Sequence, residues 1–553
     1  MEINVNNRKI LALTVCAVIS AGAFVGCGDS NKKGDGAGHM YSAALASNPE
    51  SLDPQFATDP SSATVIKNLY SGLVMQTKDG SIVCCNAESY NISEDGCVYT
   101  FKLREDNYWF FDENEDDKID EDEYFPVTAD DYVFAFRRIL DPSMHSPFAR
   151  DFLCLANSKK VSEGSYATTS LGVEALDDHT LQITLEKPCA ELLMLLATPA
   201  AFPCNEEFFL STKGRYGLDD RSVMSNGPFY VRQWFYDPYG SNNILYMRKN
   251  EVNENDKYEV LPSYVSFSVQ DSDAEVRQCF KDEEAECFST LKLGGYNSGK
   301  YNVTGQKAMT LGLVFNPDDK LYSNPALRKA VALATDKSTL EKEKGSDIQP
   351  AYGIIPPAVN ILGRSYRELS ADKQFDVFDI DQAQELVAQA KAELKVSSID
   401  SVKVIVDSST IDSRHLHTLS QEWQDSLGIY IGIEDLTTAE FNARISSGEY
   451  SIALYPLKAD FNSGIAVFDK FGSVDCLKKA VGGQNISENI LESTSIEELV
   501  NIYTATERTI IDQYGFIPLF YKSSYLVTNK DNEDLLYDPF TGAIDYRIAK
   551  NYS

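Results

Sequence analysis

Two short stretches, Val98-Tyr-Thr-Phe-Lys-Leu103 and Thr180-Leu-Gln-Ile-Thr-Leu185, alternate apolar with polar side chains. The apolar positions are Tyr99, Phe101 and Leu103 in the first stretch, and Leu181, Ile183 and Leu185 in the second. Successive side chains of a β-strand point to opposite faces of its sheet, so this alternation is typical of a strand with one buried face. Both stretches are therefore predicted to be half-buried strands.

Two later stretches repeat apolar residues at helical spacing. In one, Asp381 and Gln384 have the spacing of a helix-capping box, and the stripe is Ala383, Leu386, Val387, Ala390 and Leu394. The stripe of the other is Leu499, Ile502, Tyr503, Thr506 and Ile510. Strands early in the chain that interleave with helices further on indicate an α/β architecture with more than one sheet.

The N-terminus has the pattern of an export signal. Arg8 and Lys9 precede an apolar run over residues 10–25, and Gly26 stands before Cys27. This run is too short and too rich in small residues to span a membrane. A cysteine at the cleavage point resembles the lipobox of bacterial lipoproteins, which predicts a signal peptide over residues 1–26 and a lipid on Cys27. The alternative is an ordinary signal peptide that is cut elsewhere.

The small, polar residues that follow predict a flexible linker over residues 27–40. The protein is thus expected to be exported and held at the outer face of the bacterial cell membrane by its lipid. Removal of 26 of the 553 residues leaves 527, enough for two or three domains. A formal charge of −33 argues against nucleic acid as a partner, because phosphates would be repelled.

Motifs of catalysis are missing from the sequence. It contains neither HExxH nor GxSxG, and His415 and His417 are two positions apart, a poor spacing for a zinc pair on a helix. The segment Gly294-Gly-Tyr-Asn-Ser-Gly-Lys300 matches a phosphate loop, but Tyr301 replaces the hydroxyl residue that would hold magnesium. We interpret this segment as a connector and the protein as no enzyme. Nine cysteines follow Cys27, an odd number that predicts no particular disulfide.

A series of motifs occurs in one order along the chain: Ser51-Leu-Asp-Pro54, Asn68-Leu-Tyr-Ser-Gly-Leu-Val74, Pro126-Val-Thr-Ala-Asp-Asp-Tyr-Val-Phe134 with Arg137, Ser225-Asn-Gly-Pro-Phe229, Arg328-Lys-Ala-Val-Ala-Leu-Ala334 and Ile517-Pro-Leu-Phe-Tyr521. In this order they resemble the family 5 extracellular solute-binding proteins, the oligopeptide- and dipeptide-binding lipoproteins of ABC importers. The resemblance spans nearly the whole mature chain.

The resemblance implies a bilobal periplasmic-binding-protein-like clamp of type II, with an extra domain in the first lobe. Lobe I would be discontinuous, formed by residues 41–73, 204–310 and 513–553, and the extra domain would cover 74–203. Lobe II would cover 311–512. Two chain crossings would act as the hinge, and closure would bury the ligand between the lobes.

The resemblance also implies which residues contact the ligand. In peptide-binding members, an Asp in an Ala-Asp-Tyr-like segment receives the α-ammonium of the peptide. That segment here is Tyr455-Pro-Leu-Lys-Ala-Asp-Phe-Asn-Ser463, which points to Asp460. Counting from Ser51-Leu-Asp-Pro54 places Asp59, Pro60 and Ser61 at the opposite edge of the cleft. The alternatives are a surface or helix-capping role for Asp460 and plain loop positions for the other three.

An acidic segment, Asp112-Glu-Asn-Glu-Asp-Asp-Lys-Ile-Asp-Glu-Asp-Glu123, departs from the family pattern. Its spacing resembles the calcium loop of EF-hands and dockerins, with Asp117 where glycine is usual. Side chains of Asp112, Asn114, Asp116 and Glu123, the carbonyl of Lys118 and a water on Asp120 would hold one structural calcium. The alternative is a solvated acidic turn. No other cofactor is expected.

The sequence thus predicts a lipid-anchored receptor, a monomer, that captures peptides and delivers them to the permease subunits of an ABC importer. An alternative within the same fold is another solute, such as an oligosaccharide, a nickel complex or a signalling peptide. An alternative from another class is an extracellular adhesin or enzyme.

Overall fold

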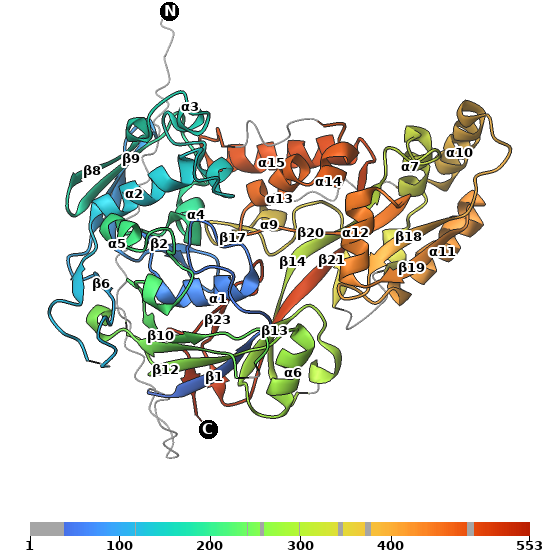
Figure 1. The fold of residues 1–553 in the computed structure, drawn as a ribbon. Helices are drawn as coiled ribbons and strands as arrows, with labels where there is room; N and C mark the ends of the chain where they lie inside the picture. The colour runs from blue at the N-terminus through green and yellow to red at the C-terminus, as the bar shows by residue number, and fades with distance from the viewer. Residues whose placement is uncertain are drawn as a thin grey trace, which may run out of the picture.

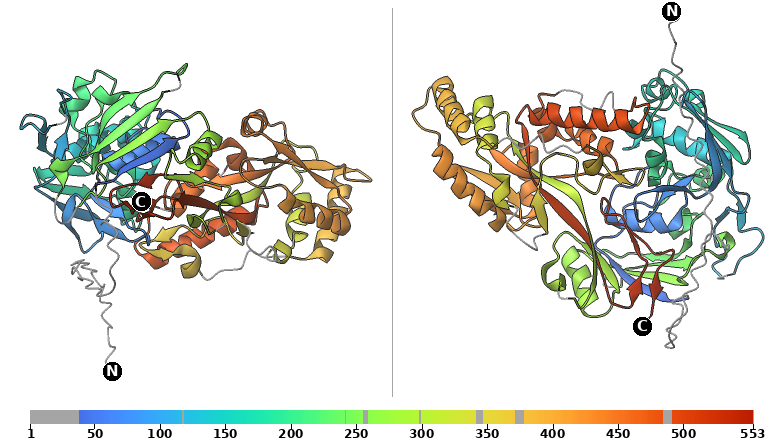
Figure 2. Two further views of the ribbon diagram at one scale, coloured as in Figure 1. Left: turned by 90° about the horizontal axis from the view of Figure 1, so that it is seen from below. Right: turned by 180° about the vertical axis from the view of Figure 1, so that it is seen from behind.

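A computed structural model describes residues 38–116, 118–240, 242–254, 259–297, 299–340, 347–370, 378–483 and 491–552. The predicted signal peptide, Cys27 and the linker as far as residue 37 lie outside this range. The chain forms two lobes side by side (Figures 1 and 2). Within the described residues, none of the helices has both the length and the apolar character that a membrane span requires.

The first lobe is built on a four-stranded sheet of order β1-β12-β11-β10. Its strands are β1 (Met40–Leu45), β12 (Tyr264–Val269), β11 (Ile244–Lys249) and β10 (Phe229–Phe235). β1 pairs with β12 in parallel, and the other pairs are antiparallel. Tyr41, Leu245 and Phe267 lie in one core with helix α1 (Pro60–Leu69). Met40, predicted to be the last linker residue, already pairs with Tyr264.

The last residues of the chain return to the first lobe. They form the short strand pairs β22 (Asn532–Glu533) with β25 (Lys550–Asn551), and β23 (Leu536–Tyr537) with β24 (Ile544–Asp545). Asn68 of α1 donates from Nδ2 to the carbonyl of Ile544 at 2.8 Å and accepts from the N–H of Tyr546 at 2.8 Å. The first lobe therefore contains both early and final segments of the chain.

A second four-stranded sheet, of order β4-β5-β9-β8, lies beside the first lobe. Its strands are β4 (Ala87–Ile92), β5 (Val98–Leu103), β9 (Thr180–Thr184) and β8 (Val173–Asp177), and helix α2 (Ala129–Leu140) packs on it. The apolar residues predicted to face the core on β5 and β9 are buried: Tyr99, Phe101, Leu103, Leu181, Ile183 and Leu185. Both strand predictions are confirmed.

A seven-stranded sheet of order β13-β21-β14-β20-β18-β19, with β15 paired to β21, extends from the first lobe, where β13 lies beside β1, into the second. The strands are β13 (Cys287–Thr290), β21 (Phe516–Thr528), β14 (Asn302–Phe315), β20 (Ile452–Lys458), β18 (Val402–Asp407), β19 (Ile431–Leu436) and β15 (Ile348–Pro350). One core joins the sheet to α7 (Pro325–Leu333), α10 (Ile380–Leu394) and α11 (Arg414–Leu427). Another joins it to α13 (Gly464–Ser473), α14 (Asp475–Ala480) and α15 (Ile496–Ile511).

Strands β14 and β21 connect the two lobes. They are antiparallel along almost their whole length, from Asn302↔Thr528 to Val314↔Phe516, and their register shifts between Lys307 and Met309. Both views of Figure 2 show the pair running from one lobe into the other. A twisted ribbon with an irregularity at its middle is a physically reasonable hinge, because bending there leaves the ladder on either side intact.

The two predicted helices exist, but one begins differently from the prediction. Helix α10 starts at Ile380, and its N-cap is Asp379, whose carboxylate accepts from the N–H of Gln382 at 2.9 Å. The predicted capping box of Asp381 and Gln384 is therefore wrong, because Asp381 already lies in the first turn. The central residues of both predicted stripes are buried: Ala383, Val387 and Ala390 on α10, and Leu499, Tyr503 and Ile510 on α15.

Candidate ligand cleft

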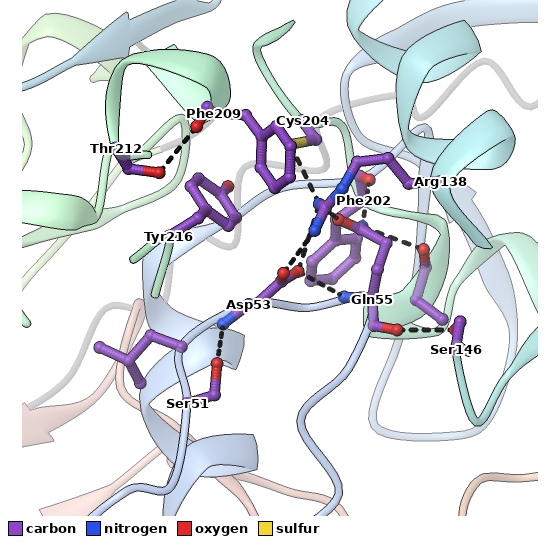
Figure 3. Close-up of polar contacts among 12 residues, drawn as sticks. Ser51, Asp53, Gln55, Arg138, Ser146, Phe202, Cys204, Phe209, Thr212 and Tyr216 are labelled. Atoms are coloured by element: carbon purple, nitrogen blue, oxygen red, sulfur yellow. Dashed lines mark hydrogen bonds and ion pairs between the residues drawn. The ribbon is translucent and has the colours of Figure 1, made fainter. Parts of the chain in front are cut away.

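The Ser51-Leu-Asp-Pro54 segment is tied to helix α2 by a buried ion pair (Figure 3). Arg138 Nη2 lies 2.5 Å from Asp53 Oδ2, and the side chains are only 4% and 8% exposed. The same guanidinium donates from Nη1 to Gln55 Oε1 at 2.8 Å. It also lies over the ring of Phe209, 4.2 Å from the centroid. This cluster holds the first lobe against the segment of residues 74–203, so it positions the cleft without lining it.

The three residues predicted at one edge of the cleft, Asp59, Pro60 and Ser61, start helix α1. Asp59 is the N-cap, and its Oδ1 accepts from the N–H of Ser62 at 2.8 Å, while Pro60 occupies the first turn. Ser61 Oγ lies 3.0 Å from Ser47 Oγ. The other carboxylate oxygen of Asp59, Oδ2, accepts from the N–H of Glu50 at 3.4 Å, so Asp59 retains limited capacity for a ligand. Its predicted ligand contact stays a prediction.

Asp460 lies just after β20, in the second lobe. Its side chain is 62% exposed, and Oδ2 accepts from Lys470 Nζ of α13 at 2.6 Å. An exposed pair of this kind holds little free energy, since water screens it and two long side chains must be ordered. A ligand cation can therefore replace Lys470 at modest cost.

The two lobes touch on either side of this position. At one contact, the hydroxyl of Ser463 donates to Glu191 Oε2 at 2.9 Å, and both residues are fully buried. Glu191 lies directly before helix α4 (Leu192–Leu196), in the segment of residues 74–203, whereas Ser463 caps α13 in the second lobe. The N–H of Ala190 donates to the carbonyl of Ser493 nearby at 3.0 Å.

The second contact joins two β-hairpins. The turn between β2 (Val74–Gln76) and β3 (Ile82–Cys84) meets the hairpin of β16 (Asn360–Ile361) and β17 (Arg364–Ser365). Gly80 has a φ of +84°, and a Cβ built on it would lie 3.1 Å from the Cβ of Asn360. Glycine is required here both by the left-handed backbone and by the close approach. The lobes therefore touch at two places in this structure.

Carboxylates of both lobes meet at the cleft. Burial, together with the neighbouring carboxylates of Asp469 and Asp460, raises the pKa of Asp151 to about 8. Burial also raises the pKa of Glu191 well above its ordinary value. Lys458, at the end of β20, has its pKa lowered by burial, an effect that Asp538 and Asp460 partly offset. The boundary between the lobes thus holds carboxyl groups together with basic side chains, among them Arg150 and Lys470.

A cavity of about 680 Å³ opens between the segment of residues 74–203 and the second lobe. Its lining includes Arg150, Cys154 and Lys187 on one side and Ile465, Asp469 and Glu492 on the other. This volume lies within the range that is typical of ligand sites, about 300–1,000 Å³. Asp460 is not among the lining residues, but its partner Lys470 directly follows Asp469, which lines the cavity. A smaller cavity of about 70 Å³, which Asn462 lines, lies between the lobes nearer the hinge.

The acidic segment lies far from this cleft. It connects β6 (Tyr108–Phe110) to β7 (Tyr124–Pro126), an antiparallel hairpin, and Asp117 is outside the described residues. No group of three or more His, Cys, Asp and Glu side chains in the described ranges is already arranged to hold a metal ion. The predicted calcium set, Asp112, Asn114, Asp116, Lys118, Asp120 and Glu123, belongs to this segment.

Sequence reasoning missed Arg138, Glu191 and Ser463. The motif recognised in the sequence included Arg137, whereas in the structure its neighbour Arg138 is the residue that reaches Asp53. Arg138 shares a side of α2 with Asp131 and Ala135, which are also buried. For Glu191 no sequence signal was available, since its partner lies 272 positions further along the chain.

Two lobes joined by a pair of crossing strands, with a cavity and facing charged groups between them, define the class of bilobal solute-binding proteins. Residues 82–476 match the family described as bacterial extracellular solute-binding proteins, family 5 Middle. Because the match covers well over half of the chain, this protein belongs to that family. The predicted family and the predicted bilobal fold are both confirmed.

Relatives and solved structures agree with this assignment. The oligopeptide-binding protein OppA of Bacillus subtilis is 23% identical over 98% of each chain. The probable deoxycholate-binding periplasmic protein YgiS of Escherichia coli is 24% identical over 86% of each. The peptide-binding pheromone receptor PrgZ superimposes with a TM-score of 0.70 at 22% identity, covering 93% of this chain and 99% of the other. OppA of Listeria monocytogenes, bound to peptide, gives a TM-score of 0.68 at 22% identity, with coverage of 93% and 99%.

Proposed function

We propose that this protein captures peptides between its two lobes and delivers them to the permease subunits of an ABC importer. The observation that carries the proposal is the cavity between the lobes, which charged side chains of both line, Arg150 and Lys187 on one side and Asp469 and Glu492 on the other. Charged groups of both signs suit a ligand that has both charges, and every unblocked peptide has an α-ammonium and an α-carboxylate. Peptide-binding relatives support the same assignment.

The peptide amine would bind at Asp460. A ligand between the lobes would displace water from Asp460, so the ion pair of the amine with this carboxylate would become stronger than on an open surface. The backbone of the peptide offers N–H and C=O groups whose recognition does not depend on sequence. Binding of many peptides by one receptor follows from these two features.

The proposed location is the outer face of the cell membrane. The lipid on Cys27 would hold the receptor there as a monomer, and the linker up to the first strand would leave it free to reach the permease. The first lobe and the second lobe would both face the permease in the closed state. Loss of the gene would then abolish uptake of the bound peptides by cells.

The test is native mass spectrometry of the purified protein. We expect adducts that dissociate in acid and are sequenced as peptides with free amino termini. Release of a bile acid, a sugar or a metal complex as the bound species would overturn the assignment to peptides while leaving the fold and the family intact.

A further inference from the structure

The two ends of the acidic segment, whose described residues are 112–116 and 118–123, are bonded together. The N–H of Phe111 donates to the carbonyl of Glu123 at 3.1 Å, and the N–H of Glu113 donates to Glu123 Oε1 at 3.0 Å. Asp112 lies between these two residues, so its backbone is flanked on both sides by contacts to Glu123. The first and last positions of the loop are therefore neighbours, as a shared metal ion would require.

The middle of the loop is curled by its own side chains. Asn114 Oδ1 accepts from the N–H of Asp116 at 2.9 Å, and Asp116 Oδ1 accepts from the N–H of Lys118 at 2.9 Å. Asn114 Nδ2 donates to Asp120 Oδ2 at 3.2 Å. These contacts bring the third, fifth and ninth positions of the loop toward one another.

Asp112 provides the independent observation. Its side chain is buried, with the residue only 7% exposed, and neither carboxylate oxygen has a hydrogen-bond partner. Glu123, at 6% exposed, is a second buried carboxylate of the same loop. An unpartnered buried carboxylate costs several kcal/mol in general, so a structure retains one where a cation compensates it.

We propose that this loop binds one calcium ion. Asp112, Asn114 and Asp116 supply side-chain oxygens, Lys118 its carbonyl and Glu123 two oxygens, while Asp120 holds a water. Binding turns Asp116 away from the ammonium of Lys118, which is 73% exposed and returns to solvent. Oxygen-only donors in this number suit calcium, whereas magnesium requires a smaller and more regular octahedron.

The ion has a structural consequence at a distance from the ligand cleft. Arg221 Nη1 donates to Glu115 Oε1 at 2.7 Å, and Arg232 Nη2 donates to the carbonyl of Glu115 at 3.0 Å. Arg221 and Arg232 belong to the first lobe, beside and on β10. Ordering of the loop by calcium therefore fixes the β6–β7 hairpin against the first lobe and leaves the affinity for peptide unchanged.

The test is calorimetric titration of the full chain, stripped with chelator, with calcium chloride and with magnesium chloride. We expect one calcium ion to bind per chain, and magnesium to bind at least about tenfold more weakly than calcium. The melting temperature should rise with the concentration of free calcium. Asp112→Asn and Glu123→Gln each remove one ligand charge and should weaken calcium binding by about tenfold or more.

Glu121→Gln is the matched control, because it removes the same charge from the same loop at a position without a ligand role. It should bind calcium nearly as the parent chain does. Equal losses for Glu121→Gln and Glu123→Gln would mean that the loop attracts cations only by its charge. Absence of a calcium-dependent melting shift in the parent chain would also overturn the proposal.

Discussion

Glu191 and Ser463 meet across the two lobes, with the hydroxyl of Ser463 2.9 Å from Glu191 Oε2 and both side chains fully buried. Ser463 also accepts from the N–H of Ile465 and so caps α13. One hydroxyl thus joins the start of a second-lobe helix to a carboxyl group of the opposite lobe. Opening of the clamp must break this contact and expose Glu191 to water.

Closure of the clamp is predicted to weaken as pH rises. Burial raises the pKa of Glu191 well above its ordinary value, and the carboxylates of Asp469 and Asp151 add to the shift. The closed state therefore holds a proton that the open state releases. The free energy by which this proton favours the closed state is complete below the ordinary pKa of Glu191. Above that pKa it falls by about 1.4 kcal/mol per pH unit, until the pH reaches the pKa of Glu191 in the closed state.

Asp151 contributes in the same direction, with a closed-state pKa of about 8. The measurement is the distance between fluorophores on the two lobes, followed from pH 4.5 to pH 8 without ligand. Glu191→Gln keeps the hydrogen bond with Ser463 but cannot ionise, so it should flatten part of the profile. A parent profile independent of pH would refute this account of closure.

Loss of the Arg138–Asp53 pair is predicted to be strongly destabilising. Asp53→Ala leaves the guanidinium of Arg138 buried without its carboxylate partner, which costs about 3–5 kcal/mol in general. Denaturant unfolding gives the change in the free energy of unfolding. The matched control is Arg414→Ala, which breaks the surface pair with Asp412, where the arginine side chain is 85% exposed.

That control should change the free energy of unfolding by at most about 1 kcal/mol. If Asp53→Ala and Arg414→Ala had similar effects, the buried cluster would not be what joins the first lobe to α2.

The lipid anchor is predicted to depend on Cys27 alone. Wild-type protein should partition into detergent with acyl mass on its first residue, and Cys27→Ala should lack that mass. Cys16→Ala, in the apolar run of the predicted signal, is the matched control and should be processed and acylated normally. Wild-type protein that is released to the medium and cut at another position would contradict the prediction.

Local patterns predicted the parts of the fold that depend on neighbouring residues. The alternation around Phe101 and Leu181 identified β5 and β9, because one face of each strand is buried in the same core. The start of α10 was misplaced by two residues because Asp379 and Asp381 are both good capping residues, and tertiary packing selected the first. A sequence pattern cannot make this choice.

Buried charges could not be predicted, because their partners are remote in the sequence. Arg367 pairs with Glu507 140 positions away, and nothing near either residue indicates the other. Asp460 was found only through the family resemblance, and its neighbour Lys470 was not expected. The EF-hand-like spacing of the acidic loop is visible in the sequence, whereas the isolation of the Asp112 carboxylate is visible only in the structure.

Removal of the charge at Asp460 is predicted to weaken peptide binding. Asp460→Asn keeps the shape of the side chain but loses the ion pair with the peptide amine, a change of about 1.5–3 kcal/mol in affinity. The control is Asp318→Asn, which removes another exposed carboxylate that pairs with a lysine, here Lys479. It should leave the affinity unchanged.

Calorimetric titration with one peptide in two forms tests the central claim most directly. The peptide is one recovered from the purified protein or, where none is recovered, the best binder among defined tripeptides to pentapeptides, with its amino terminus free or acetylated. We predict that acetylation weakens binding to the parent chain by at least about tenfold. This factor corresponds to the smallest free energy, about 1.5 kcal/mol, that the loss of one hydrogen bond to a charged group typically costs. Acetylation should have little further effect on Asp460→Asn. Equal affinity of the parent chain for both forms would contradict the claim that the cleft holds a peptide by its amine.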